Sequence, residues 1–203
     1  MKITWYGHSC FVVESGGYRV AIDPYGDSIG YPPLHISAHK VLTTHDHSDH
    51  NNVSAVTILP EKENPFSIRA VMSAHDDCGG RKRGKNSIYV LSAEGQTVVH
   101  LGDLGAALTE AQKKDIGACD AVMVPVGGYY TIDGKTAAAV ADALSARVVI
   151  PMHYSFGKYG YPETSGIAPF LSCVDKNLIH SPESNAIILT KDTPKQVCCL
   201  SFI

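Results

Sequence analysis

The chain has 203 residues, a formal net charge of −3 and a hydrophobic content of 44%. This length suits a single domain covering residues 1–203, and the composition is that of a globular protein. The nearly balanced charge gives no general argument for binding nucleic acid or a membrane surface. No apolar run approaches the ~20 residues of a membrane-spanning helix, and the first residues lack the apolar core of a signal peptide. We therefore expect a soluble protein of the cytoplasm.

Apolar residues recur in short runs separated by turn residues, which is typical of β-strands. The first three runs predict an antiparallel meander at the N-terminus, with strands at 2–6, 10–14 and 18–22. Further strands are predicted at 40–43, 67–72, 87–91, 96–101, 120–125 and 147–151, a closing hairpin at 186–190 and 196–202, and helices at 109–117, 136–146 and 163–174. This order favours an α+β fold in which two mixed sheets pack face to face with helices outside.

The most informative stretch directly follows the strand predicted at 40–43. It reads Thr-His-Asp-His-Ser-Asp-His and supplies four side chains of metal-ligating type: His45, His47, Asp49 and His50. Imidazole and carboxylate groups suit zinc, and also manganese or iron. A metal ion held in this way can lower the pKa of a bound water to ~7 and so provide hydroxide at neutral pH. The stretch therefore predicts a catalytic metal site.

Three more side chains of ligating type follow strand-like runs further along the chain. They are His75, Asp103 and His153. Loops at the ends of strands are held by the rigid sheet, which makes them suitable carriers of chemistry. We expect these three residues to complete the metal site.

The residues quoted so far resemble the H-x-H-x-D-H signature of the metallo-β-lactamase superfamily, and the order of the later His and Asp residues matches as well. Three further motifs resemble those of one branch of the superfamily: Trp5-Tyr6-Gly7-His8-Ser9, Arg83-Gly84-Lys85-Asn86 and Pro151-Met152-His153-Tyr154. That branch consists of small Zn-dependent hydrolases related to the ascorbate-6-phosphate lactonase and N-acyl phosphatidylethanolamine phospholipase D groups. The resemblance covers nearly the whole chain.

The resemblance implies an αββα sandwich with a two-metal site, in which zinc is favoured and manganese or iron is an alternative. It assigns the first metal ion to His45, His47 and His75. It assigns the second to Asp49, His50 and His153, with Asp103 bridging the two. It also implies that Asp49 orients the attacking water and carries its proton.

Several other residues are candidates for supporting roles. Asp23 is expected to accept a hydrogen bond from a ligand imidazole, although an aspartate in the turn before Pro24 is the alternative. His8 is either a proton donor or substrate contact, or a structural histidine bonded to the backbone. His100 is expected to support a ligand from behind.

One basic cluster, residues 81–85, follows His75 closely enough to overhang the metal ions. Arg83 and Asn86 belong to a motif that resembles the branch, so we predict that these two residues contact the substrate. Arg83 could bind a phosphate or carboxylate. A solvated loop without a target is the alternative. Tyr129, Tyr130 and Tyr154 are further candidates for the pocket wall.

Together these patterns indicate a metal-dependent hydrolase that uses a metal-bound hydroxide on a small anionic ester, lactone or phosphodiester. The alternatives are a nuclease or cyclic-nucleotide phosphodiesterase, a mononuclear iron oxygenase, and a non-catalytic metal-binding protein. No second domain that could close over RNA and no lipid-anchoring segment is visible. A small-molecule substrate is therefore favoured over nucleic acid or membrane lipid, and a homo-oligomer is left open.

Overall fold

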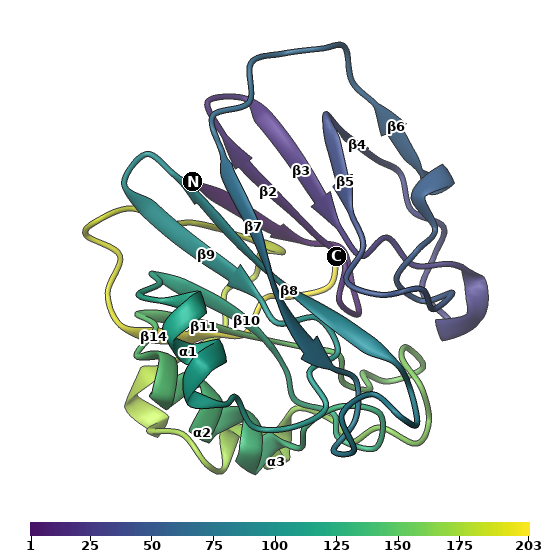
Figure 1. Cartoon of the computed structure of the whole chain (residues 1–203), viewed down its shortest axis with the longest axis vertical. Helices are drawn as coiled ribbons and strands as arrows, with labels where there is room; N and C mark the ends of the chain where they lie inside the picture. The colour runs from purple at the N-terminus through teal and green to yellow at the C-terminus, as the bar shows by residue number, and fades with distance from the viewer.

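The computed structural model describes residues 1–203, and two β-sheets packed face to face form its centre (Figure 1). The five-stranded sheet has the order β13 (Ala186–Ile188), β1 (Lys2–Trp5), β2 (Phe11–Ser15), β3 (Tyr18–Ile22), β5 (Lys40–Leu42). The seven-stranded sheet has the order β12 (Ile179–His180), β14 (Gln196–Cys198), β11 (Val148–Met152), β10 (Ala121–Pro125), β9 (Gln96–His100), β8 (Lys85–Ala93), β7 (Ser67–Ala74). A small parallel ribbon pairs β4 (Ile36–Ala38) with β6 (Val56–Ile58).

The α-helices lie on the side of the seven-stranded sheet that faces away from the five-stranded sheet (Figure 1). They are α1 (Glu110–Ile116), α2 (Gly134–Leu144) and α3 (Ala168–Leu171). Helix α1 packs against β7, and α2 packs against β10 and α3. Thr109 begins α1 with a reciprocal capping box to Gln112, which satisfies free N–H groups of the first turn. None of the helices has the length and apolar character needed to cross a membrane.

Alternation along the strands divides the apolar side chains between two cores. In β2, Phe11 and Val13 face the main core between the sheets, while Val12 faces a second, smaller core on the outer side. This is the period of two that a strand requires. The outer core is covered by the segment from Tyr25 to Val56, which includes the 3₁₀ turns η1 (Asp27–Ile29) and η2 (Val53–Ala55), and β4 and β6. The predicted α+β sandwich of mixed sheets is confirmed, and this segment supplies its outer layer on the five-stranded side.

Two local predictions were wrong. The strands predicted as a closing hairpin do not pair with each other, because β13 pairs with β1 in one sheet and β14 pairs with β11 in the other. The chain between β13 and β14 crosses from one sheet to the other. The residues of the two strands do not specify this crossing. The helix predicted at 163–174 is reduced to the four residues of α3. Pro169 lies in the first turn of α3, where proline is tolerated, but a helix from residue 163 would place Gly166 and Pro169 in its interior, where both residues are disfavoured.

The strand directions bring many strand ends to one edge of the sandwich. Strands β1 and β3 both run antiparallel to β2, and β3 runs parallel to β5. In the other sheet, β7 and β9 both run antiparallel to β8, and β9, β10 and β11 are parallel. The loops that follow these co-directed strands are therefore neighbours in space.

The central position of β11 leads to a test of the core. Ile150 in β11 is 0% exposed, whereas Ile58 in β6 is 62% exposed. We expect Ile150→Ala to lower the free energy of unfolding by about 2–5 kcal/mol because it leaves a cavity, and Ile58→Ala to change it by less than about 0.5 kcal/mol. Denaturant titration followed by circular dichroism measures both values. Equal losses in the two variants would contradict the position assigned to β11.

Candidate metal centre

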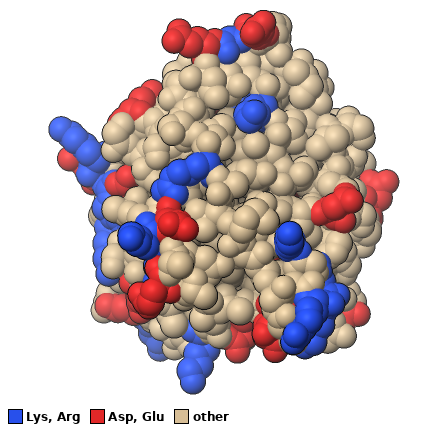
Figure 2. All heavy atoms as spheres, in the orientation of Figure 1, with Lys and Arg blue, Asp and Glu red and all other residues tan.

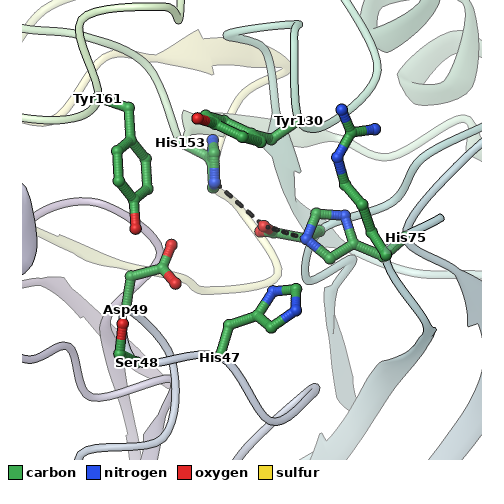
Figure 3. Close-up of a pocket in the computed structure, with 9 residues that line it drawn as sticks. His47, Ser48, Asp49, His75, Tyr130, His153 and Tyr161 are labelled. Carbon is green, nitrogen blue, oxygen red and sulfur yellow. Dashed lines mark ion pairs between the residues drawn. The ribbon is translucent and has the colours of Figure 1, made fainter.

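The predicted ligands lie in loops that follow the co-directed strands. The loop 43–50 follows β5, His75 follows β7 directly, and His153 follows β11 directly. Asp103 lies shortly after the end of β9. Figure 3 shows His47, His75, His153 and Asp49 pointing into the same pocket from different elements. All seven predicted ligand residues are thus brought to one edge of the sandwich.

The carboxylate of Asp103 lies in the middle of this group. Its Oδ2 is 3.1 Å from Nε2 of His153, 3.2 Å from Nε2 of His75 and 3.8 Å from Nε2 of His45. Its Oδ1 is 3.3 Å from Nε2 of His50. Asp103 is 1% exposed. One buried carboxylate therefore faces imidazoles that come from both sheets.

The ligand-type atoms around Asp103 form overlapping groups, in each of which all atoms lie within 4.8 Å of one another; His45, His50 and Asp103 form one that joins two others. The first group is His45, His47 and His75. The second group is His8, Asp49, His50 and His153. These groups correspond to the two sets that the resemblance implied, with His8 added to the second.

Asp23 supports the centre from behind, and it is fully buried. Its Oδ2 is 2.8 Å from Nδ1 of His50, which leaves Nε2 of that imidazole free to face the centre. The same carboxylate accepts 2.7 Å hydrogen bonds from the backbone N–H and the hydroxyl of Thr44. Asp23 therefore fixes both the tautomer of His50 and the start of the loop 44–50, which is the role of a residue that orients a metal ligand.

His8 lies inside the centre, in the turn after β1, and is 1% exposed. Its Nε2 is 3.1 Å from Oδ2 of Asp49, and its ring centroid is 4.2 Å from that of His153. Its backbone carbonyl accepts a 2.9 Å hydrogen bond from Nε1 of Trp5. His8 is absent from the pocket wall, so it contacts Asp49 rather than the pocket contents.

Burial favours the neutral form of several imidazoles, which is the form that binds a metal ion. Burial lowers the pKa of His45 to about 3, with the neighbouring His50 adding to the shift. Burial, with His153 beside it, lowers the pKa of His8 to about 4. His50 differs: burial lowers its pKa, but the carboxylates of Asp103 and Asp23 outweigh burial and raise that pKa well above the usual value. The excess of negative charge around His50 therefore attracts a cation.

The carboxylates remain ionised in spite of burial. Burial raises the pKa of Asp103, but the imidazoles of His153 and His50 outweigh it and hold that pKa well below its usual range. The neighbouring imidazoles of His50 and His8 similarly outweigh burial at Asp49 and lower its pKa. An ionised carboxylate offers oxygen lone pairs to a cation.

Several buried polar atoms of the centre lack a hydrogen-bond partner: Nε2 of His45, His50 and His153, and Oδ1 of Asp103. Such atoms are costly unless another group satisfies them. They converge within one group of imidazoles and carboxylates, which is the donor set that divalent zinc prefers. The residues present therefore fit a metal centre.

The centre forms the floor of an open pocket with a volume of about 310 Å³. His47, Asp49, His75, Asp103 and His153 contribute to its lining, together with Ser48, Arg83, Tyr130 and Tyr161. Figure 3 shows the rings of Tyr130 and Tyr161 beside the histidines. This volume is at the lower end of the range of about 300–1,000 Å³ for small-molecule sites.

For two of the predicted site residues, the observed contacts differ from the predicted role. Asn86 does not line the pocket: it is 0% exposed, and its side chain bonds to Ser73, to the carbonyl of Leu101 and to the backbone N–H of Asp103. It supports Asp103 because β8 lies beside β9, so its predicted role as a substrate contact does not match the structure. His100 supports backbone instead of a ligand side chain, since its Nε2 is 2.9 Å from the carbonyl of Ser9 and its Nδ1 accepts from Gly102 at 3.1 Å.

The structure also shows which of the candidate tyrosines and which residues of the basic cluster line the pocket. Tyr130 lines the pocket, but Tyr129 is 63% exposed and Tyr154 is buried against Trp5, so neither is part of the wall. Within residues 81–85, only Arg83 reaches the pocket. Tyr161 was missed from the sequence. The sequence signal was the Tyr- and Gly-rich stretch 157–161, which begins a few residues after His153.

Comparisons with known proteins agree with this fold and centre. Residues 2–153 match the family model of the β-lactamase superfamily domain, and the chain belongs to this superfamily. A curated relative from Nitratidesulfovibrio vulgaris, named UPF0173 metal-dependent hydrolase, is 30% identical over 75% of this chain and 80% of its own length. A relative of the same name from Pyrobaculum arsenaticum is 28% identical over 76% of this chain and 84% of its own length.

A solved structure gives the same assignment. A crystal structure from Thermotoga maritima, whose name places it among the Zn-dependent hydrolases of the metallo-β-lactamase superfamily, matches with a TM-score of 0.78 and 33% identity. The match covers 98% of this chain and 97% of that chain. The family and fold predicted from the sequence are confirmed. The expectation of a metal-dependent hydrolase is confirmed at the level of class, whereas none of these names specifies a substrate.

The contact between Asp23 and His50 leads to a test of the centre. In Asp23→Asn, the loss of the carboxylate weakens the orientation of His50, so we expect zinc affinity to fall about 10–100-fold. Asn is suitable because Asp23 has a φ of 51°, a left-handed conformation that Asn tolerates. Competition with a chromophoric chelator measures the affinity, and the exposed Asp27→Asn serves as the control. Unchanged affinity in Asp23→Asn would contradict this role.

Proposed function

We propose that the protein is a zinc-dependent hydrolase that holds two metal ions at this centre and cleaves an ester, lactone or phosphodiester bond in a small molecule. The observation that carries the proposal is the pair of donor groups on either side of Asp103, at the floor of a pocket of small-molecule size. Manganese and iron accept the same donor types, so they remain the alternative metals.

The proposal assigns each donor to a place. One ion is held by His45, His47 and His75. The other is held by Asp49, His50 and His153. Asp103 faces both groups and is assigned to both ions. When bound, such ions activate water and stabilise negative charge that develops on the oxygen of the attacked group.

Asp49 is the residue assigned to proton transfer. It lines the pocket, and its lowered pKa keeps it ionised, so a carboxylate oxygen faces the position of the attacking water. Its Oδ2 is 3.1 Å from Nε2 of His8 and 3.3 Å from Nε2 of His50. These two imidazoles hold the carboxylate in position, and we assign His8 to orienting Asp49.

The pocket favours a small molecule over a nucleic acid. Binding to a strand of nucleic acid requires a positively charged groove that follows the phosphates. Arg83 is the only Lys or Arg in the pocket lining. On the face shown in Figure 2, Lys and Arg side chains form no continuous track: one group lies at the lower right, and most of the others lie apart and among Asp and Glu. The nuclease alternative therefore has less support.

The central test is a panel of phosphodiesters, lactones, thioesters, β-lactams and simple esters, assayed on protein loaded with zinc or manganese. On any substrate that is cleaved, we expect Asp49→Ala to lower kcat by about 10²–10⁴-fold, because the proton acceptor and one donor of the second ion are lost together. Asp46→Ala is a matched control, since Asp46 lies in the same loop but is exposed. Its kcat is expected to stay within twofold of the wild type.

Metal analysis completes the test. Protein purified without added metal is expected to contain zinc rather than iron, and iron at a single site would favour the oxygenase alternative. If wild type and Asp49→Ala both bind metal and are equally inactive on every substrate, the hydrolase proposal fails and a non-catalytic metal-binding protein is favoured.

A further inference from the structure

The pocket has one cationic side chain outside the metal centre. Arg83 lines the wall beside His75 and Tyr130, and its guanidinium carbon is 5.5 Å from the centre of the Tyr130 ring. The adjacent Lys82 pairs with Asp77 at 3.0 Å, but none of the ion pairs in the structure involves Arg83. Arg83 is half-buried, whereas Arg81, Lys82 and Lys85 are exposed. The cation that faces the pocket therefore has no anionic partner within the protein, and it is the half-buried member of the cluster.

The loop that carries Arg83 is fastened by a single carboxylate. Oδ1 of Asp76 accepts hydrogen bonds from the backbone N–H groups of Cys78 and Gly80, and Oδ2 accepts from those of Lys82 and Arg83, each at 2.8 Å. Asp76 is 2% exposed. Charge-assisted bonds to backbone N–H groups are among the stronger hydrogen bonds in proteins. They hold the backbone of the loop in a defined position beside the metal centre.

The loop is also tied to the sheet on both sides. The backbone N–H of His75 bonds to the carbonyl of Gly84 at 3.1 Å, and that of Gly105 bonds to the carbonyl of Ala74 at 2.9 Å. A side chain at Gly105 would collide with the backbone of His75 and Asp76, so the chain after Asp103 packs directly against the base of the loop. A fixed backbone and a ring under the guanidinium restrict where Arg83 can point, which lowers the entropy lost when it binds a ligand.

We infer that Arg83 binds an oxyanion of the substrate, a carboxylate or a phosphate, at a short distance from the bond that is cleaved, and that Asp76 is the positioning residue for Arg83. The planar fork of a guanidinium matches both oxyanions with two hydrogen bonds. The substrate class is then an ester, lactone or phosphodiester that carries a second, non-reacting anionic group. For the reaction, this inference rests on the proposed function. For the binding of an anion, it rests only on Arg83 and the loop that holds it.

The activity test compares two 4-nitrophenyl esters on zinc-loaded protein: the butyrate, and the glutarate monoester that adds a terminal carboxylate. We expect the wild type to have a lower KM for the glutarate monoester. Arg83→Met should raise that KM about 10–100-fold and lower by a similar factor the preference for the glutarate monoester over the butyrate, because the lost bonds are to the anion alone. Arg83→Lys keeps the positive charge but loses the planar guanidinium fork. Its KM for the glutarate monoester should lie between those of the wild type and Arg83→Met. Arg81→Met, at an exposed position of the same loop, is the control.

Asp76→Asn tests the positioning role. The amide replaces one accepting oxygen by an N–H₂ group, which cannot accept from the backbone N–H groups it meets. We expect a higher KM for the glutarate monoester, with kcat for the butyrate and zinc content retained. A purely structural role would instead lower both activities together. If this variant does not fold, the Arg83 variants still decide the inference.

A binding measurement separates this inference from the proposed function. Calorimetry with glutarate and with glycerol 3-phosphate gives the Kd of a carboxylate and of a phosphate for zinc-loaded wild type, Arg83→Met and Arg81→Met. A Kd that rises at least tenfold in Arg83→Met alone, for either ligand, supports the inference and identifies the oxyanion, even if no ester is cleaved. Equal Kd values for both ligands in wild type and Arg83→Met overturn it, as does an equal rise in KM for both esters.

Discussion

The buried carboxylate of Asp103 is the contact on which the two halves of the centre depend. It follows β9 of the seven-stranded sheet, yet its Oδ1 lies 3.3 Å from Nε2 of His50, in a loop of the five-stranded sheet. An ionised carboxylate without partners would be very costly at this depth. The imidazoles around it reduce that cost, and their own unsatisfied nitrogens create a need for a cation. Folding of the sandwich and assembly of the donor set are therefore the same event.

The backbone of the centre shows that this arrangement is demanding. His8, Asp23 and His153 all have left-handed conformations, with φ values of 49°, 51° and 53°. Such conformations are uncommon for residues other than glycine and cost of the order of 1–3 kcal/mol each. Each lies directly after, or shortly after, the end of a strand, where the chain must turn sharply into the site. Hydrogen bonds such as that from Trp5 to the carbonyl of His8, at 2.9 Å, hold these turns in place.

The candidate donors could be identified from the sequence because the information is local. A His or Asp at the end of an apolar run can be recognised without knowing which strands pair, and co-directed strands then bring such ends together. Pairing itself was less predictable: β13 and β14 are neighbours in sequence but belong to different sheets. The choice between sheets depends on which apolar face each strand buries, and this is a property of the whole fold.

The direction in which a polar side chain points was the other feature that could not be predicted from the sequence. Asn86 and Arg83 lie close together in sequence, and both were expected at the substrate. The structure places Asn86 inside, where its Oδ1 accepts from the N–H of Asp103 at 2.9 Å, and Arg83 at the pocket. Asn86 belongs to β8 and Arg83 precedes it in the loop. Only the register of β8 against β7, with Asn86 opposite Ser73, determines which side chain turns inward.

The end of β7 shows how one position serves two purposes. Successive side chains at a strand end point in opposite directions. His75 thus faces Asp103, with its Nε2 3.2 Å from Oδ2, while Asp76 turns away and gathers the backbone of the loop 76–83. The donors follow the ends of strands in the two sheets, whereas the pocket wall depends on this loop and on the segment that carries Tyr161. Substitutions of side chains in the loop can therefore alter which molecule is recognised, because the hydrogen bonds to Asp76 that hold the loop come from its backbone and not from those side chains.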